Sequence, residues 1–432
     1  MVFTGWRKTG HIDLEAVEMA VRRSMHRAGA AAVSRLLSDT SRQPQRRSCC
    51  CGGEAPFHSI RPKSLLTVLG PVRFERAYYV CAGCHQGQSP RDRELEVEGS
   101  EFSPGVRRMM ALVGSESSFD QGREQLQLLA GLEVTAKAVE RQAEAIGADV
   151  ETREQDHIHR AKQLELPVVG GASVPILYIE MDGTAVPVVK AETEGRMGKM
   201  EGQPAHTREV KIGCVFTQTT TDQESRPVRD DGSTTYVAAI ETAEAFGLRL
   251  YTEAWRRGWS RATKKVVIGD GAVWIWNLAG QHFPGAIQIV DFYHARQHLW
   301  ELSARLFPHH DKVRKRWIAR CLDRLDRGNI EALAKILRDS QPATAELAKT
   351  VTNEAEYFER NAERMRYPAF REQGLFVGSG VVEAGCKTVI ASRLKRSGMF
   401  WTVRGADAII ALRCSRLSRR FEDYWESRSR AA

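Results

Sequence analysis

The sequence lacks long apolar runs. No stretch of about 18 or more uncharged apolar residues occurs in its 432 residues, which argues against a membrane-spanning helix. The N-terminal segment MVFTGWRKTGHIDLEAVEM likewise lacks the continuous apolar core of a signal peptide. With 42% hydrophobic and 27% charged residues, the composition is that of a globular protein with two or three domains. We therefore expect a cytoplasmic protein without a membrane partner.

Acidic residues are fewer than basic residues in this chain. The chain has 54 Asp and Glu against 63 Lys and Arg, a formal net charge of +9. Much of the excess lies in three local clusters, RQPQRRS near residue 45, KVRKRWIAR near 315 and RLKRSGMFWTVR near 400. Such clusters suit a polyanion such as DNA, although the solvated faces of helices give the same pattern.

Cysteine is sparse outside one segment. Five of the nine cysteines lie between residues 49 and 84, and in a cytosolic chain such a concentration favours metal binding over disulfides. A predicted hairpin around a Gly-Pro turn leads into Cys81 and Cys84, whose C-x2-C spacing lets two thiolates reach one tetrahedral ion. The arrangement resembles a zinc ribbon with a structural Zn²⁺ held by Cys49, Cys51, Cys81 and Cys84.

Three alternatives to this ligand set stay open. The CCC run leaves the choice between Cys49 and Cys50 undecided, although C-x-C spacing favours Cys49. His58 or His85 could replace one of the cysteines. The thiols could also be reduced and merely structural.

Two helical regions flank this module. Residues 13–38 carry apolar residues at helical spacing, with Asp13 as a cap. Residues 103–151 are helical in pattern, and the last two helices meet at a Gly-Leu turn with Thr135 placed to cap the second, much like a helix-turn-helix. Lys137 and Arg141 would then face a DNA groove, whereas the alternative is a plain helical hairpin.

Beyond these helices the pattern changes to short buried strands separated by helices. The order is strand, strand, strand, helix, strand, helix, strand, which predicts an α/β ribonuclease-H-like fold with a mixed five-stranded sheet. The segment from His294 to about Arg371 is almost wholly helical in pattern, which indicates an all-helical insertion. The predicted strands are ILYIEMDG (176–183), REVKIGCVFTQTT (208–220), TTYVAAIE (234–241), KKVVIGDG (264–271) and AIQIVDFYH (286–294).

These patterns predict six segments. They are an N-terminal helical region (1–45), the zinc-ribbon-like module (46–100), a helical DNA-binding region (101–165), the first part of the catalytic core (166–296), the helical insertion (297–372), and the closing catalytic helix with a basic helical C-terminal region (373–432).

Three acids occupy the places that a ribonuclease-H-like site requires. Asp182 is predicted at the end of the first strand, Asp270 just after the fourth, and Glu383 on the closing helix. The first and fourth strands are neighbours in such a sheet, so these side chains can converge. Carboxylates suit two Mg²⁺ (or Mn²⁺) ions that take part in phosphoryl transfer. A lone Asp-Gly after a strand, in contrast, often only caps a helix.

The chain resembles bacterial insertion-sequence transposases of the ISKra group, within the DDE transposase superfamily. The resemblance covers most of the chain from Cys49 to about Trp401. It implies catalytic acids at Asp182, Asp270 and Glu383. Related families often carry a proline or another residue where this chain has Cys50. The matching stretches include YIEMDGTAV, REVKIGCVFT, IGDGAVWIWNLA, FPGAIQIVDFYHARQHLW and GSGVVEAGCKTVIASRLKRSGMFW.

The stretch VDFYHA looks like the D-x2-H signature of related transposases with helical insertions. Asp291 and His294 are therefore candidates for an accessory site that orients DNA or supports the acids. Asp291 also competes with Asp270 as the second carboxylate. We prefer Asp270, because its strand neighbours the first.

Basic and aromatic residues follow Glu383. Lys387 lies one turn later on the same helix face, where it can meet a phosphate. Phe400 and Trp401 could wedge against an unpaired base, or could simply pack beneath the helix. The predicted DNA-binding residues of this region are Arg393, Lys395, Arg396 and Trp401.

The sequence therefore predicts a nucleoid-associated DNA transposase that cuts transposon ends and joins a 3′-hydroxyl to target DNA. Because two ends must be brought together, we expect a homo-oligomer on double-stranded DNA. A non-catalytic DNA-binding regulator and a structure-selective nuclease of the same fold are the alternatives.

Overall fold

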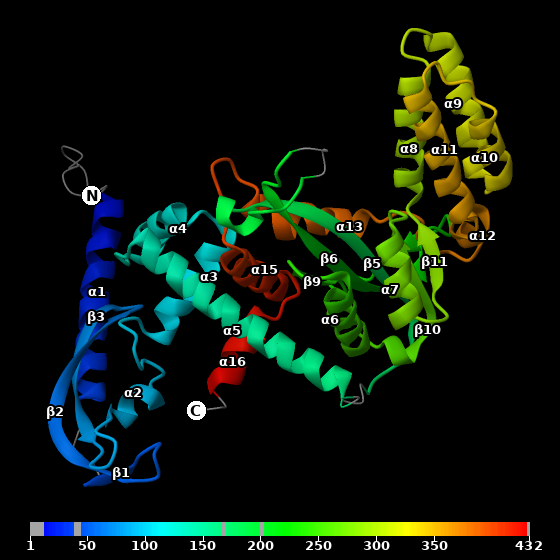
Figure 1. Ribbon diagram of the computed structural model, residues 1–432. Helices are drawn as coiled ribbons and strands as arrows, with labels where there is room; N and C mark the ends of the chain where they lie inside the picture. The colour runs from blue at the N-terminus through cyan, green and yellow to red at the C-terminus, as the bar shows by residue number, and fades with distance from the viewer. Residues whose placement is uncertain (1–12, 39–44, 164, 166–169, 199–202, 430–432) are drawn as a thin grey trace. The chain divides into compact units, whose positions relative to one another are not determined.

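A computed structural model of the protein describes residues 13–38, 45–163, 165, 170–198 and 203–429. The chain forms two compact units. The first contains the residues up to Ile146 together with those from Glu422 onward, and the second runs from Gly147 to Phe421. The helices and strands of both units are labelled in Figure 1.

The first unit contains a four-stranded antiparallel sheet in the order β1-β2-β3-β4. The central strands β2 and β3 form the hairpin that the sequence predicts. Gly70 begins β3 with a φ of +107°, a conformation that favours glycine at this tight turn. The bounds are β1 (Arg46–Ser48), β2 (Glu54–Thr67), β3 (Gly70–Val80) and β4 (Gly87–Gln88).

Helix α1 (Leu14–Leu37) packs against this hairpin. It begins as predicted at Asp13, whose carboxylate accepts a hydrogen bond from the Ala16 backbone N–H at 3.2 Å. Ala30 enters the small apolar core formed by β2 and β3. The other buried members of this core are Leu65, Val72, Phe74 and Val97.

A group of helices completes the first unit. The turn at Gly131 has a φ of +68°, and Thr135 caps the next helix by accepting from the Ala138 N–H at 3.1 Å, so both features of the predicted helical turn are confirmed. The elements are α2 (Pro90–Glu94), α3 (Pro104–Glu116), α4 (Phe119–Gln125), the π-helix η1 (Leu126–Ala130), α5 (Ala136–Lys162), which continues into the second unit, and α16 (Phe421–Ser429).

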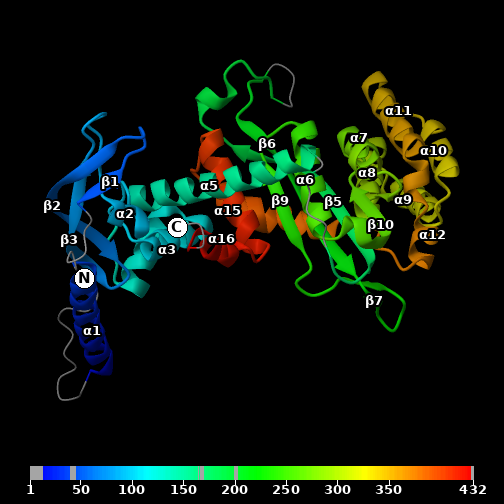
Figure 2. The same ribbon diagram turned by 90° about the horizontal axis from the view of Figure 1, so that it is seen from below.

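The second unit is built on a five-stranded mixed sheet in the order β11-β10-β5-β6-β9, of which Figure 2 labels β10, β5, β6 and β9. Strands β5, β6 and β9 form an antiparallel meander, and β10 and β11 continue the sheet in parallel with β5. The first and fourth strands are therefore neighbours, as predicted. The bounds are β5 (Val174–Pro187), β6 (Thr207–Gln218), β9 (Thr235–Ala239), β10 (Ala262–Gly269) and β11 (Ile287–Val290).

Helices cover both faces of this sheet. On β6, Gly213 lies against Phe246 and Leu250 of α6 (Ala243–Arg256), while the adjacent Ile212 lies against Gly385 at the end of α13. Because successive residues of a strand point to opposite faces, α6 and α13 lie on opposite sides. The other helices around the sheet are α7 (Val273–His282), α13 (Gly380–Gly385), the π-helix η5 (Cys386–Ala391), α14 (Ser392–Leu394) and α15 (Val403–Leu417).

A wholly helical segment separates β11 from α13, as the sequence predicts, and Figure 1 shows its helices gathered beside the β10–β11 edge. Its elements are α8 (Phe292–Leu306), α9 (Asp311–Asp326), α10 (Ile330–Arg338), α11 (Ala345–Arg360), η4 (Ala362–Met365) and α12 (Tyr367–Glu372).

Short elements complete the second unit: the 3-10 turns η2 (Lys190–Thr193) and η3 (Trp259–Arg261), and the small ribbon of β7 (Thr220–Thr221) and β8 (Pro227–Val228). Of the helices in the described parts of the chain, none combines the length and the apolar character needed to cross a membrane.

Candidate functional site

Four cysteines of the first unit converge on one point. Cys49 and Cys51 come from the turn between β1 and β2, and Cys81 and Cys84 follow β3. The Sγ atoms of Cys49 and Cys84 are 3.5 Å apart, as are those of Cys51 and Cys81, and all four lie within 4.8 Å of one another. Thiolates about 2.3 Å from a tetrahedral Zn²⁺ would be separated by roughly 3.8 Å, so this donor set fits such an ion.

The structure also decides between the adjacent cysteines. Cys50 is exposed and directs its Sγ to Gln86 Oε1 at 3.4 Å, outside the set of four. Neither His58 nor His85 belongs to that set. The backbone N–H groups of Cys84 and Gly83 lower the pKa of the Cys81 thiol to about 6, which favours the thiolate form that a metal ion binds.

Asp182 lies on β5 of the second unit, and Asp270 directly follows the neighbouring strand β10. The parallel pairing of these strands ends with Glu180 matched to Ile268, and each aspartate comes two residues after its member of this pair. Contrary to the prediction, Asp182 does not end its strand, because β5 continues to Pro187 as a hairpin with β6. Its partner β10 ends at Gly269, so Asp182 lies at the edge where the parallel pairing stops.

Glu383 lies on α13, which is followed directly by a residue that contacts Asp182. Cys386, three residues later, donates from its Sγ to Asp182 Oδ2 at 3.1 Å. Burial and the charge of Asp182 raise the pKa of this thiol, so it stays protonated and able to donate. Within the described residues, only the four cysteines form a set of three or more metal-type ligands within 4.8 Å, so the three acids are more widely spaced.

Two buried carboxyl groups hold the closing helix in place. Glu180 of β5 accepts from the Val382 N–H at 2.8 Å, and burial raises the pKa of Glu180 to about 8. Asp291 accepts from the N–H of Ser379 at 2.9 Å and from its hydroxyl, immediately before α13. Its other oxygen accepts from the Tyr293 and His294 N–H groups at 2.6 and 3.1 Å.

Asp291 therefore connects the start of the helical insertion to the start of α13. It is 1% exposed and uses both oxygens to hold backbone N–H groups. This arrangement leaves it unsuited to compete with Asp270 as a metal ligand. It fits the alternative role of supporting the acids.

The insertion also contacts the turn that carries Asp270. The Asp270 side chain caps this turn by accepting from the Ala272 N–H at 2.9 Å. Tyr357 of α11 donates its hydroxyl to the Asp270 carbonyl oxygen at 2.9 Å and packs its ring against Gly271, where no side chain would fit. The φ of Gly271 is +99°, so glycine is required for conformation as well as for space.

A chain of polar contacts continues from Tyr357 into the insertion. Its ring stacks on His298, with ring centroids 4.5 Å apart. Nδ1 of His298 lies 2.8 Å from Glu354 Oε2, and its Nε2 lies 3.2 Å from His294 Nε2. Burial lowers the pKa of His298, but the hydrogen bond and charge of Glu354 outweigh it, so the pKa is raised overall. His294 thus joins a network beside Asp270 instead of standing alone.

Tyr357→Phe removes only the hydroxyl that supports this turn. We expect it to lower the free energy of unfolding by about 1 kcal/mol, because the Asp270 carbonyl loses its donor while the ring stacking is kept. Chemical denaturation of both proteins measures the change. Tyr293→Phe, the same substitution at an exposed ring, is the matched control, and equal stability of all three proteins would refute this role.

Two predicted DNA-contacting side chains remain near the acids. Lys387 is exposed one turn after Glu383. Lys395 is also exposed, and its Nζ donates to Thr184 Oγ1 at 2.5 Å, two residues beyond Asp182 on β5. Arg396 is half-buried and donates from Nε to the Ser392 carbonyl oxygen at 2.8 Å. In the first unit, Lys137 and Arg141 are both exposed on α5.

The prediction that Arg393 and Trp401 contact DNA is wrong. Arg393 is 0% exposed, and its guanidinium lies 4.9 Å from the centre of the Trp401 ring. Trp401 is itself buried and donates from Nε1 to the Leu394 carbonyl oxygen at 3.1 Å. Trp401 forms an isolated parallel bridge with Val188, directly after the end of β5. Phe400, in contrast, is exposed.

A protein-family model and solved structures match this chain. The model of the uncharacterised protein family UPF0236 matches residues 7–211, which is under half of the chain. None of the curated proteins matches. Among the solved structures that match is a Drosophila P element transposase strand transfer complex, with 9% identity over 71% of this chain and 90% of that chain. The TM-score of 0.33 is too low to establish a shared fold.

Proposed function

We propose that this chain is a DNA transposase of the DDE type, with a ribonuclease-H-like catalytic domain in its second unit. The carrying observation is that Asp182 on β5 and Asp270, directly after the parallel strand β10, each come two residues beyond the last paired position, and that Cys386, directly after the helix of Glu383, donates to Asp182. The strand order β11-β10-β5-β6-β9 supports the proposed fold.

Asp182, Asp270 and Glu383 would hold two Mg²⁺ or Mn²⁺ ions. When bound, such ions lower the pKa of a nucleophilic water or hydroxyl and neutralise the charge of the leaving oxygen.

The chain's own residues would position the acids and the DNA. Glu180 and Asp291 fix α13, and therefore Glu383, relative to β5. Lys387 and Lys395 would hold phosphates beside the acids. In the first unit, a structural Zn²⁺ on the four cysteines would stabilise the end of the hairpin, and Lys137 and Arg141 would contact DNA.

A strand-joining assay tests this proposal. The purified chain is incubated with Mg²⁺, a DNA fragment that carries the end of its element, and a supercoiled target plasmid. A transposase covalently joins the 3′-hydroxyl of the fragment to the plasmid. Cleavage without joining would indicate a nuclease of the same fold, and specific binding without cleavage would indicate a regulator. Either of these results would refute the proposed function.

A further inference from the structure

Helix α9 of the insertion carries a cluster of basic side chains on its solvent-facing side. At 100° per residue, these side chains lie within an arc of about 140°. The other side of the helix packs into the insertion through Trp317, Ile318, Cys321 and Leu325. We call the exposed cluster the α9 basic face, which consists of Lys312, Lys315, Arg316 and Arg320.

The fold does not neutralise the α9 basic face. Within the described parts of the chain, none of its four residues forms an ion pair. Asp323, the next acid on this side of the helix, pairs with Arg327 at 2.8 Å. Elsewhere in the insertion, the exposed Arg338 pairs with Glu359 at 2.6 Å. Because like charges four residues apart on a helix repel one another, the uncompensated face indicates an anionic partner outside the insertion.

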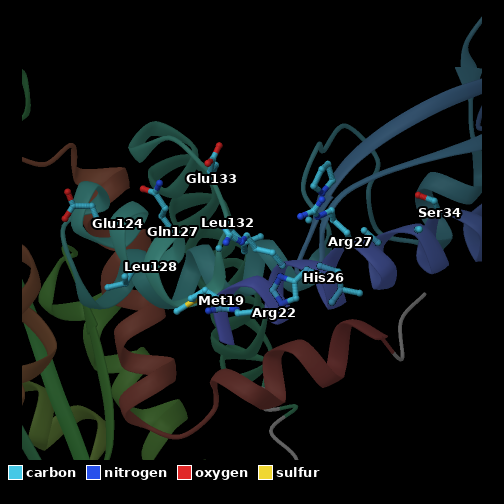
Figure 3. Close-up of a pocket in the computed structure, with 17 residues that line it drawn as sticks. Met19, Arg22, His26, Arg27, Ser34, Glu124, Gln127, Leu128, Leu132 and Glu133 are labelled. Carbon is cyan, nitrogen blue, oxygen red and sulfur yellow. The ribbon is translucent and has the colours of Figure 1, made fainter. Parts of the chain in front are cut away.

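The basic residues of α1 in the first unit differ in this respect. Arg22, Arg23 and Arg27 line a cavity of about 850 Å³ that Glu124 and Glu133 also line (Figure 3). Acidic side chains therefore share that cavity with the arginines. The α9 basic face is the stronger candidate for a surface that binds an anion, because no acid is paired with it.

The α9 basic face lies beside the end of α8 that is far from the sheet. Helix α8 begins directly after β11, which runs parallel to β10, so it starts at the edge where Asp270 lies. Helix α9 runs back beside α8 (Figure 1). Near its start, Arg314 donates to Ser303 at 3.2 Å, and at its end Asp326 pairs with Arg296 at 3.2 Å. The length of α8 therefore separates the face from this edge by roughly 20 Å, or about six base pairs of duplex DNA.

The chemistry of this face fits DNA better than a protein or a membrane. Of the large apolar residues of α9, only Val313 is exposed, at 45%. The core of a protein interface and a helix lying in a membrane surface both require exposed apolar side chains. Each strand of duplex DNA carries a phosphate about every 3.4 Å along the axis, so the roughly 12 Å between Lys312 and Arg320 spans about four phosphates.

We propose that the α9 basic face binds the phosphate backbone of duplex DNA independently of base sequence. The choice of DNA among polyanions rests on the proposed function. The face belongs to the same unit as the three acids, so it would hold the duplex several base pairs beyond the bond that reacts. Contacts to phosphates fix the position of a duplex without reading its sequence.

Binding of the full chain to a fluorescent duplex without Mg²⁺, measured by anisotropy at several salt concentrations, tests this face. The double variant Lys312→Gln, Lys315→Gln removes two charges, and in the described parts of the chain neither side chain makes a hydrogen bond or ion pair that the fold would lose. It should bind at least about ten-fold more weakly near 0.1 M salt. The slope of log affinity against log salt should become shallower by about 1.8, since each phosphate contact contributes about 0.9.

The matched control is the double variant Lys335→Gln, Lys349→Gln. It removes two charges from exposed lysines of α10 and α11 and should leave the affinity and the salt slope unchanged. Equal weakening by both double variants would show an effect of net charge alone and would overturn the proposal. Binding of the Lys312→Gln, Lys315→Gln protein at the affinity of the wild type would also overturn it.

Two duplexes of unrelated sequence test the independence from sequence. The double variant on α9 should weaken binding to both by the same factor, and a loss confined to one duplex would overturn a backbone contact. A wild type that binds both duplexes but joins no strands would refute the proposed function and leave this face in place. A wild type that binds neither duplex would overturn both proposals.

Discussion

Asp270→Asn is expected to bind the end of its element as tightly as the wild type and to cleave it at least about a thousand-fold more slowly. A thousand-fold loss corresponds to roughly 4 kcal/mol of transition-state stabilisation, the size expected for a lost metal ligand. Asparagine keeps an oxygen that can accept from the Ala272 N–H, so the turn before α7 keeps its cap. The substitution therefore removes the charge while leaving the local fold in place.

The same reasoning applies to the other two acids. Asp182→Asn keeps one side-chain oxygen, which can accept from the Gly183 N–H, and replaces the oxygen that accepts from the Cys386 thiol with an amide NH2 group. Glu383 is exposed, so Glu383→Gln disturbs no packing. Cleavage rates and DNA affinity of the three variants are measured separately, so that loss of chemistry is distinguished from loss of binding.

The matched control for these variants is Asp222→Asn. Asp222 lies in an exposed turn of the same unit, where its carboxylate accepts from the N–H groups of Glu224 and Arg226 at 2.9 and 2.8 Å. The variant makes the same chemical change away from the acids and should cleave normally. If all three acid variants also cleave normally, the assignment of the catalytic site is wrong.

Removing one ligand of the cysteine cluster is expected to have the largest effect on stability. The wild type should carry one Zn²⁺ per chain, and Cys84→Ser should carry none. Structural zinc contributes on the order of 10 kcal/mol to the folding of small zinc domains. The first unit has its own apolar core around α1 and the hairpin, so we expect a loss of several kcal/mol, confined to that unit.

Cys50→Ser provides the matched control for the cluster. It makes the same substitution next to Cys49, at a thiol that is exposed and lies outside the set of four. It should retain the full zinc content and the wild-type unfolding temperature. Elemental analysis and thermal unfolding measure both properties. A Cys84→Ser protein that keeps its zinc, or a Cys50→Ser protein that loses it, would contradict the ligand assignment.

The strand order of the second unit could be predicted because its strands are short apolar runs separated by clear helical patterns. The C-terminal end of β5 could not be predicted from the sequence. The segment from Asp182 to Pro187 is less apolar than the start of the strand, and it is extended because it pairs with β6 beyond the end of β10. Pairing between residues distant in the sequence sets the end of β5, and no local sequence pattern indicates it.

The residues that support the site were harder to find than the acids. Glu180 left a signal, since it interrupts the apolar stretch ILYIEMDG two residues before Asp182. Tyr357 left none, because it reaches Asp270 from 87 residues away in the chain. Arg393 was mistaken for a DNA contact because its charge suggested exposure. The ring of Trp401 instead covers its guanidinium.

The central claim is that Asp270 holds a metal ion that takes part in DNA cleavage. Cleavage by Asp270→Cys in Mg²⁺, compared with cleavage in a softer ion such as Mn²⁺ or Cd²⁺, tests it most directly. A thiolate is a poor ligand for Mg²⁺ but binds softer ions, so the variant should be inactive in Mg²⁺ and regain cleavage with the softer ion. Cleavage by Asp270→Cys in Mg²⁺ at the rate of the wild-type protein would contradict the claim.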